Sequence, residues 1–183
     1  MASKIMIIRH AEKPNGKVLG DKIDGSNDPE SLIPQGWQRA GALASFFDPS
    51  RAWSVAGIQI PTSLFAAAPG NDDQHSARPL ETITPLAAKL NMQVNSSFKK
   101  EALADMVAAA KASKGVVLIS WQHEDIPAIA NLIIPAPNTI PQKWPGDRFD
   151  VVWVFDAQAN GAYAFSQVTQ QLLAGDLTTP ISA

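Results

Sequence analysis

Two short apolar runs, each followed closely by a histidine, constrain the fold of this chain more than any other feature. Residues 4–8 read Lys-Ile-Met-Ile-Ile and lead directly into Arg9 and His10. Residues 116–120 read Val-Val-Leu-Ile-Ser and are followed three residues later by His123. Continuous apolar runs of this length are typical of strands buried on both faces, as in parallel sheets. Because the carboxyl ends of parallel strands meet at one edge, we expect the two histidines to converge on one crevice.

The rest of the chain predicts an alternation of strands and helices. The expected helices cover residues 35–47, 78–90, 98–112 and 126–133, and further strands are expected at 64–68, 149–155 and 162–168. Pro85 is expected to kink its helix or restart it at Thr84. The last two strands are joined by Asn160-Gly161, a hairpin signal. This order predicts an α/β three-layer sandwich: a mostly parallel central sheet flanked by helices, with an antiparallel hairpin near the C-terminus.

Two long irregular segments are expected to shape the pocket. Residues 11–34 and 134–148 are rich in glycine, proline and polar residues, and long loops inside a compact domain are usually functional or disordered. We expect them to set substrate specificity, whereas the tail after Gly175 is expected to fray. No linker or repeat divides the 183 residues, so residues 1–183 are expected to form a single domain.

Composition excludes several classes of function. The 15 basic and 17 acidic residues give a net charge of −2 without a basic run, so no nucleic-acid or membrane partner is expected. The absence of cysteine removes disulfides and thiolate chemistry, and three histidines leave little for a metal centre; no cofactor is expected. Only four apolar residues separate Lys4 from Arg9, too few for a signal peptide, so the expected location is cytoplasmic. The oligomeric state stays open.

Four residues stand where they could handle a phosphate group. His10 is a candidate nucleophile for phosphoryl groups, and Arg9 beside it a candidate cradle for the phosphate. Arg78, at a helix start, could supply a second guanidinium; the alternative is a surface arginine paired with Glu81 or Asp72. His123 precedes a helix N-terminus, where an imidazole and free backbone N–H groups can face an anion.

Each histidine also has an ordinary interpretation. His10 could be a partly buried histidine bonded to the backbone, and His123 a capping or structural residue. His75 stands in a polar loop and is expected to be solvated or to brace that loop. Among the five tryptophans, Trp121 alone is expected to line the pocket, and the others to belong to the core or its rim.

Taken together, three segments resemble the histidine phosphatase superfamily, also called phosphoglycerate-mutase-like. They are Ile-Ile-Arg-His-Ala-Glu-Lys at residues 7–13, Ser-Ala-Arg-Pro-Leu-Glu-Thr at 76–82, and Trp-Gln-His-Glu at 121–124. Residues 32–40 also look like the first-helix entry of that family. The resemblance spans the chain from Ile5 to about Trp153 and marks it as a small single-domain member.

The resemblance implies a role for each matching residue. His10 would be the phosphohistidine nucleophile, and Arg9, Arg78 and His123 would form the phosphate pocket without a metal. Lys13 stands where the phytase-like branch has a second arginine, so it could add a phosphate contact. For the proton donor, Glu124 ranks first because that branch has an acid directly after the second histidine. Asp125 and Glu101 are the alternatives, Glu101 corresponding to the solution of the mutase branch.

The implied activity is that of a histidine acid phosphatase-like enzyme, a phosphoric monoester hydrolase acting on a small phosphorylated metabolite. Two departures from the family pattern stand near His10: Ala11 replaces a glycine, and Gly16 stands where the mutase branch tends to have asparagine. The second departure weakens the alternative of a phosphoglycerate-mutase-like phosphotransferase. A third alternative is a catalytically silent module that binds phosphate ligands on the same fold.

Overall fold

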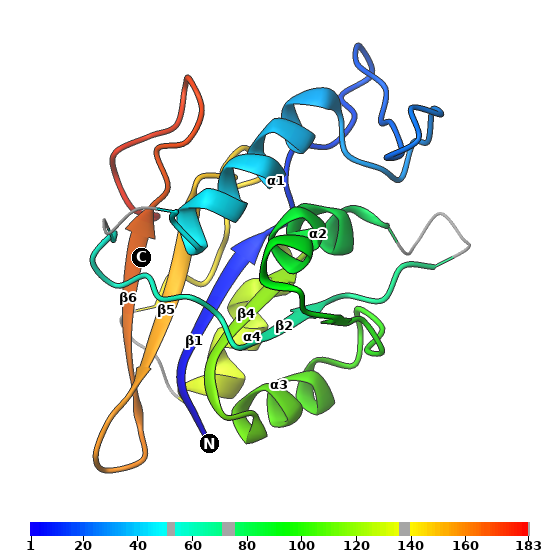
Figure 1. The fold of residues 1–183 in the computed structure, drawn as a ribbon. Coiled ribbons are helices and arrows are strands. Elements are labelled where there is room, and N and C mark those ends of the chain that lie inside the picture. The colour runs from blue at the N-terminus through cyan, green and yellow to red at the C-terminus, as the bar shows by residue number, and fades with distance from the viewer. Residues whose placement is uncertain (51–53, 71–75, 136–139, 183) are drawn as a thin grey trace.

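A computed structural model describes residues 1–50, 54–70, 76–135 and 140–182, and within them one six-stranded sheet carries the fold. In chain order its strands are β1 (Ala2–Arg9), β2 (Ser63–Ala66), β3 (Val94–Asn95), β4 (Gly115–Trp121), β5 (Val151–Ala157) and β6 (Tyr163–Thr169). The helices are α1 (Pro34–Phe47), α2 (Arg78–Leu90), α3 (Leu103–Ala112) and α4 (Ile126–Ile133). The strand order across the sheet is β3-β2-β4-β1-β5-β6 (Figure 1).

The first strand lies near the middle of the sheet, as its continuous apolar run predicts. It pairs in parallel with β4 and antiparallel with β5, while β2 pairs in parallel with both β3 and β4. The hairpin of β5 and β6 is antiparallel and stands at the other edge. Arg9 lies opposite Trp121, and the His10 N–H extends the ladder to the Trp121 carbonyl at 2.9 Å. The register therefore brings the ends of both histidine-bearing strands together.

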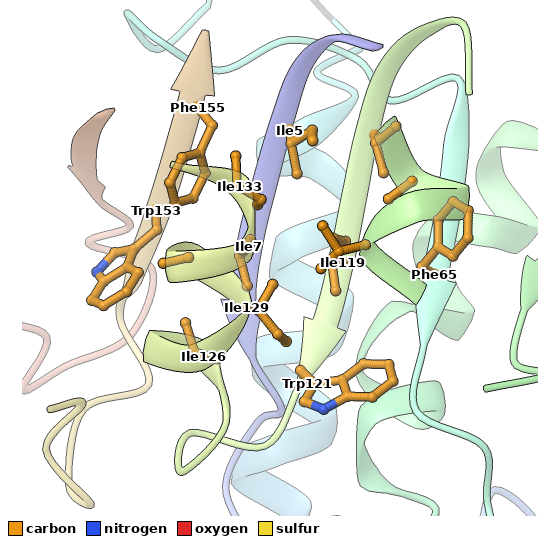
Figure 2. Close-up of a cluster of buried hydrophobic side chains, with 14 of the residues drawn as sticks. Ile5, Ile7, Phe65, Ile119, Trp121, Ile126, Ile129, Ile133, Trp153 and Phe155 are labelled. Carbon is orange, nitrogen blue, oxygen red and sulfur yellow. The ribbon is translucent and has the colours of Figure 1, made fainter. Parts of the chain in front are cut away.

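Alternation along the central strands divides the core into two layers. Ile5 and Ile7 face α3 and α4, and Figure 2 shows them beside the α4 isoleucines. Met6 and Ile8 face the opposite side, where the apolar residues of α1 and α2 pack. Burying both faces removes most of the apolar surface of these strands from water, which is the main favourable contribution to folding. The predicted three-layer sandwich is confirmed.

Some boundaries differ from the predicted ones for local reasons. Helix α3 begins at Leu103, not at residue 98, because the Ala68 N–H bonds to the Phe98 carbonyl and a turn joins Lys99 to Ala102. Helix α2 runs through Pro85 as one element, without a restart at Thr84. The two-residue strand β3 follows α2 and was not predicted.

The C-terminal tail is held in place, so the expectation that it frays is wrong. The Asp176 carboxylate pairs with Arg39 of α1, and the Leu177 N–H donates to the Asp150 carboxylate at 2.6 Å. Ile181 is buried and exchanges two hydrogen bonds with the Gln167 side chain on β6. Such long-range polar contacts cannot be read from local sequence. Within the part of the chain described, no helix is long and apolar enough to cross a membrane.

Candidate active site

A pocket of about 460 Å³ opens where β1 and β4 end, beside the N-terminus of α2. It is lined by most of the residues singled out from the sequence: His10, Lys13, Arg78, Glu101, Glu124 and Asp125. Glu30, Ser76, Lys100 and Gln122 also line it. The pocket forms at this edge because the strands deliver their polar turns there, as expected for an open α/β sheet.

The His10 imidazole is buried and held in one orientation. Its Nδ1 lies 2.7 Å from the carbonyl oxygen of Ala11, which can only accept, so Nδ1 carries the proton. Burial, together with the positive charge of Arg9, lowers the pKa of His10 to about 3. The ring is therefore neutral at physiological pH, with the lone pair on Nε2. A neutral imidazole with a free ring nitrogen is the form that a nucleophile requires.

The backbone around His10 is braced by α1 and α2. The Ala11 N–H donates to Thr82 Oγ1 at 2.8 Å, and the Glu12 carbonyl accepts from the Ile33 N–H at 3.2 Å. Gly36, in the first turn of α1, lies so close that a Cβ there would stand 2.6 Å from the Glu12 carbonyl oxygen. Glycine at this position allows the helix to support the turn that carries His10.

Arg9 is buried beside His10, and within the described part of the chain its guanidinium has one nitrogen with hydrogen-bond partners and two without them. Its Nη1 donates to the carbonyl of Gly146 at 2.6 Å and to that of Arg148 at 3.2 Å, and the guanidinium stacks 3.8 Å from the Phe149 ring centroid. Its Nε and Nη2 are buried and have no hydrogen-bond partner among the residues that the structure describes. Burial lowers the pKa of Arg9 to about 10, so it remains a cation at neutral pH. Two unpaired N–H groups on one edge of a guanidinium match the geometry of an oxyanion.

His123 lies close to the Arg9 guanidinium and beside Glu124. Its Nδ1 is 2.9 Å from Glu124 Oε2, without the alignment of a hydrogen bond. Burial lowers the pKa of His123, the Arg9 charge lowers it further, and Glu124 opposes both. His123 and Arg9 are not among the residues that line the pocket, although both adjoin residues that do, Glu124 and His10.

Arg78 begins α2, as predicted. Among the described residues its side chain bonds to the long loop and not to Glu81, and Asp72, the other partner considered, lies outside the described residues. The Arg78 Nη2 donates to the Pro29 carbonyl at 2.6 Å and pairs with Glu30 Oε2 at 3.2 Å, and its Nε donates to the Ser31 carbonyl at 3.3 Å. Glu81 instead binds the Ser31 hydroxyl and the Leu32 N–H. The N-terminal turn of α2 thus holds the end of the long loop against the pocket.

The carboxyl groups in the pocket differ in environment. Burial raises the pKa of Asp125, although the Gln122 side-chain amide, which donates to its carboxylate, opposes the shift. The Glu124 side chain is 63% exposed, and Glu101 lies 3.9 Å from Lys100. Among the described residues, no three His, Asp or Glu side chains are placed to hold a metal ion.

One predicted lining residue lies elsewhere. Trp121 is fully buried in the core on the α3 and α4 face, where Figure 2 shows it below Ile129. Alternation explains this placement: Trp121 follows Val117 and Ile119 on one face of β4, and the pocket lies beyond the strand. His75 lies outside the described residues. Glu30 and the carbonyls around Arg9 were missed, because their contacts join segments far apart in sequence.

Comparisons with solved structures show that the fold of this chain is a known one. The chain matches a structure of the protein histidine phosphatase SixA complexed with tungstate, with a TM-score of 0.57, 11% identity, and 91% of this chain and 97% of that chain covered. This chain has the histidine phosphatase fold. A mycobacterial glucosyl-3-phosphoglycerate phosphatase with inorganic phosphate matches with a TM-score of 0.52 and 12% identity, over 92% of this chain and 97% of that chain.

A third solved structure that matches is that of a mutant phosphoserine phosphatase from Entamoeba histolytica in complex with phosphoserine. It matches with a TM-score of 0.52 and 12% identity, and 94% of this chain and 98% of that chain are covered. No family model and no curated protein matches the sequence. At such identities the likeness is one of fold, and it confirms the fold that the sequence resemblance implied.

Proposed function

We propose that this protein is a metal-independent phosphomonoester hydrolase that works through a phosphohistidine on His10. The observation that carries the proposal is the His10 imidazole, which lines the pocket, is neutral through burial and is oriented by the Ala11 carbonyl. The substrate class is a small phosphorylated metabolite. The tungstate, phosphate and phosphoserine in the matched structures support a phosphate-ester ligand.

The reaction follows from where the charges lie. The Nε2 lone pair of His10 attacks phosphorus, the bond from phosphorus to the ester oxygen breaks, and the leaving oxygen takes a proton from a pocket carboxyl. Water then attacks the phosphohistidine, gives a proton back to that carboxylate, and releases phosphate and neutral His10. Cations stabilise the charge on the equatorial oxygens. Arg9, through its unpaired Nε and Nη2, would carry most of this task, with Lys13, Arg78 and His123 around it.

The activity is tested with p-nitrophenyl phosphate in the presence of EDTA. Wild-type protein is expected to release nitrophenol, and rapid quenching with labelled substrate should trap an acid-labile, alkali-stable phosphoenzyme. Transfer of the label to an added alcohol in place of water would support the phosphotransferase alternative. Tight phosphate binding without turnover on any ester would leave the fold as a binding module and contradict the proposal.

Glu124 and Asp125 compete for the role of proton donor. Glu124 follows His123 directly, but it is largely exposed, whereas burial raises the pKa of Asp125 and favours the protonated form that an acid requires. We expect Asp125→Asn to lower turnover of an alkyl phosphate about 100-fold, and Glu124→Gln to lower it less. The same variants should slow p-nitrophenyl phosphate less, because its leaving group needs little protonation. Equal losses on both esters would assign these carboxyls a structural role.

The contact between Arg78 and Glu30 predicts a variant that binds phosphate more tightly than the wild type. A phosphate that binds the Arg78 guanidinium must compete with the Glu30 carboxylate, which pairs with it at 3.2 Å. Glu30→Gln removes the competing charge and is expected to tighten inorganic phosphate binding about threefold to fivefold. Isothermal titration measures the binding, and Asp105→Asn, at an exposed residue of α3 outside the pocket lining, serves as an acid-to-amide control. Unchanged or weaker binding in Glu30→Gln alone would show that Arg78 only anchors the loop.

A further inference from the structure

The guanidinium of Arg9 owes its orientation to one short segment before β5. Three carbonyl oxygens face Nη1, from Pro145 at 3.5 Å, Gly146 at 2.6 Å and Arg148 at 3.2 Å. The Phe149 ring covers the guanidinium plane. Because these contacts fix both the position of Nη1 and the plane of the guanidinium, they also fix the direction in which Nε and Nη2 point. Residues 144–150 thus determine where the unpaired donors point.

This segment is in turn fastened by the side chains of Arg148 and Asp150, both buried. Arg148 Nε donates to Asp150 Oδ1 at 2.7 Å, and its Nη2 donates to the Thr179 carbonyl at 2.7 Å. The other oxygen of Asp150 accepts the Leu177 N–H at 2.6 Å. The Trp144 indole donates to the same Arg148 carbonyl that Arg9 uses, at 2.9 Å. Residues 177–179 of the C-terminal tail therefore hold the segment in place through hydrogen bonds to Arg148 and Asp150.

The ion pair of Arg148 and Asp150 differs from an exposed ion pair because both of its partners are buried. Arg148 is 8% exposed and Asp150 is 4% exposed, so the loss of one partner leaves an uncompensated buried charge that forces the segment to rearrange. A rearrangement moves the Gly146 and Arg148 carbonyls, and with them the Arg9 guanidinium. Small displacements of a group that binds a reacting phosphate have large kinetic effects.

From these contacts we propose that Arg148 is a positioning residue for Arg9: through Asp150 and the C-terminal residues 177–179 it holds the carbonyls that aim the Arg9 guanidinium at the phosphate. Arg148 itself does not line the pocket with His10. The expected change in KM and kcat rests on the proposed function. The claim that Arg148 orients the Arg9 guanidinium does not depend on turnover.

The test measures phosphate binding and Arg9 order in the full-length protein. Arg148→Met is expected to weaken inorganic phosphate binding about tenfold, and to raise KM for p-nitrophenyl phosphate more than it lowers kcat. Arg148→Lys, which keeps the charge but not the fork, should lie in between. In ¹⁵N spectra the Arg9 Nε–H, assigned with Arg9→Lys, should exchange with water faster in Arg148→Met.

Two controls separate positioning from general destabilisation. Lys4→Met removes another buried ion-pairing cation, the partner of Asp156 at the opposite end of β1, and should leave phosphate affinity unchanged. In an Arg9→Met background, Arg148→Met should cause no further loss. Wild-type affinity and unchanged Arg9 exchange in Arg148→Met would overturn the inference, as would an equal loss in Lys4→Met. If wild-type protein shows no turnover, the proposed function fails, while the Arg9 exchange rates still decide whether Arg148 positions Arg9.

Discussion

Replacement of His10 by alanine is expected to lower turnover of p-nitrophenyl phosphate at least about 1,000-fold and to abolish the trapped phosphoenzyme. The reason is chemical: within the proposed mechanism no other group on the pocket wall forms the covalent intermediate. Steady-state kinetics and rapid-quench labelling measure the two effects on identically purified proteins.

The same variant should still bind phosphate, because the cations around the pocket are untouched. Phosphate titration and far-UV circular dichroism of His10→Ala therefore serve as controls for an intact pocket. His10→Asn, which fills more of the buried space, is expected to be as inactive as His10→Ala. Turnover in either variant within tenfold of wild type would exclude His10 as the nucleophile.

Replacement of Arg39 by methionine is expected to lower the free energy of unfolding by about 3–5 kcal/mol. The Arg39 side chain is 4% exposed, and its Nη2 lies 2.8 Å from Glu12 Oε1 and 2.7 Å from Asp176 Oδ1. Methionine fills similar space but leaves both carboxylates buried without their cation. Urea unfolding followed by tryptophan fluorescence measures the change.

The effect should depend on pH with a defined sign. Burial disfavours the Asp176 carboxylate, but hydrogen bonds from Arg39 and from the backbone N–H groups of Leu173 and Leu172 outweigh it and lower the pKa of Asp176. A group with a lowered folded pKa stabilises the fold above its unfolded pKa, about 3.9, and this stabilisation is lost as the pH falls through the folded value. The difference between wild type and Arg39→Met should therefore shrink below about pH 4.

Two further variants test this account of Arg39. Lys22→Met removes the more exposed pair with Asp28, whose atoms lie 3.8 Å apart, and should change stability by less than about 1 kcal/mol. Adding Glu12→Gln and Asp176→Asn to Arg39→Met should restore part of the loss, because no buried charge is then left unpaired. A triple variant as unstable as the single one would mean that packing, not charge, dominates at Arg39.

The elements nearest the site were predictable because their signals are local. Two apolar runs of strand length and helical apolar spacing in α1 and α4 depend on neighbours within a few residues, and the structure confirms the predicted strands and helices near these positions. The placement of His10 and His123 at one edge of the sheet followed from the geometry of parallel strands, because β1 and β4 pair in parallel. Trp121 was misplaced because it was assigned to the turn, whereas β4 extends to include it and alternation sends it into the core.

Local patterns in the chain specify its two buried central strands and the polar turns at their carboxyl ends. The partner that each charged side chain takes depends on the assembled fold. Glu30 is 48 residues from Arg78, and the Gly146 carbonyl is 137 residues from Arg9. A buried cation must find a partner, but its own sequence neighbourhood does not name that partner, because the choice depends on how distant loops meet at the edge of the sheet.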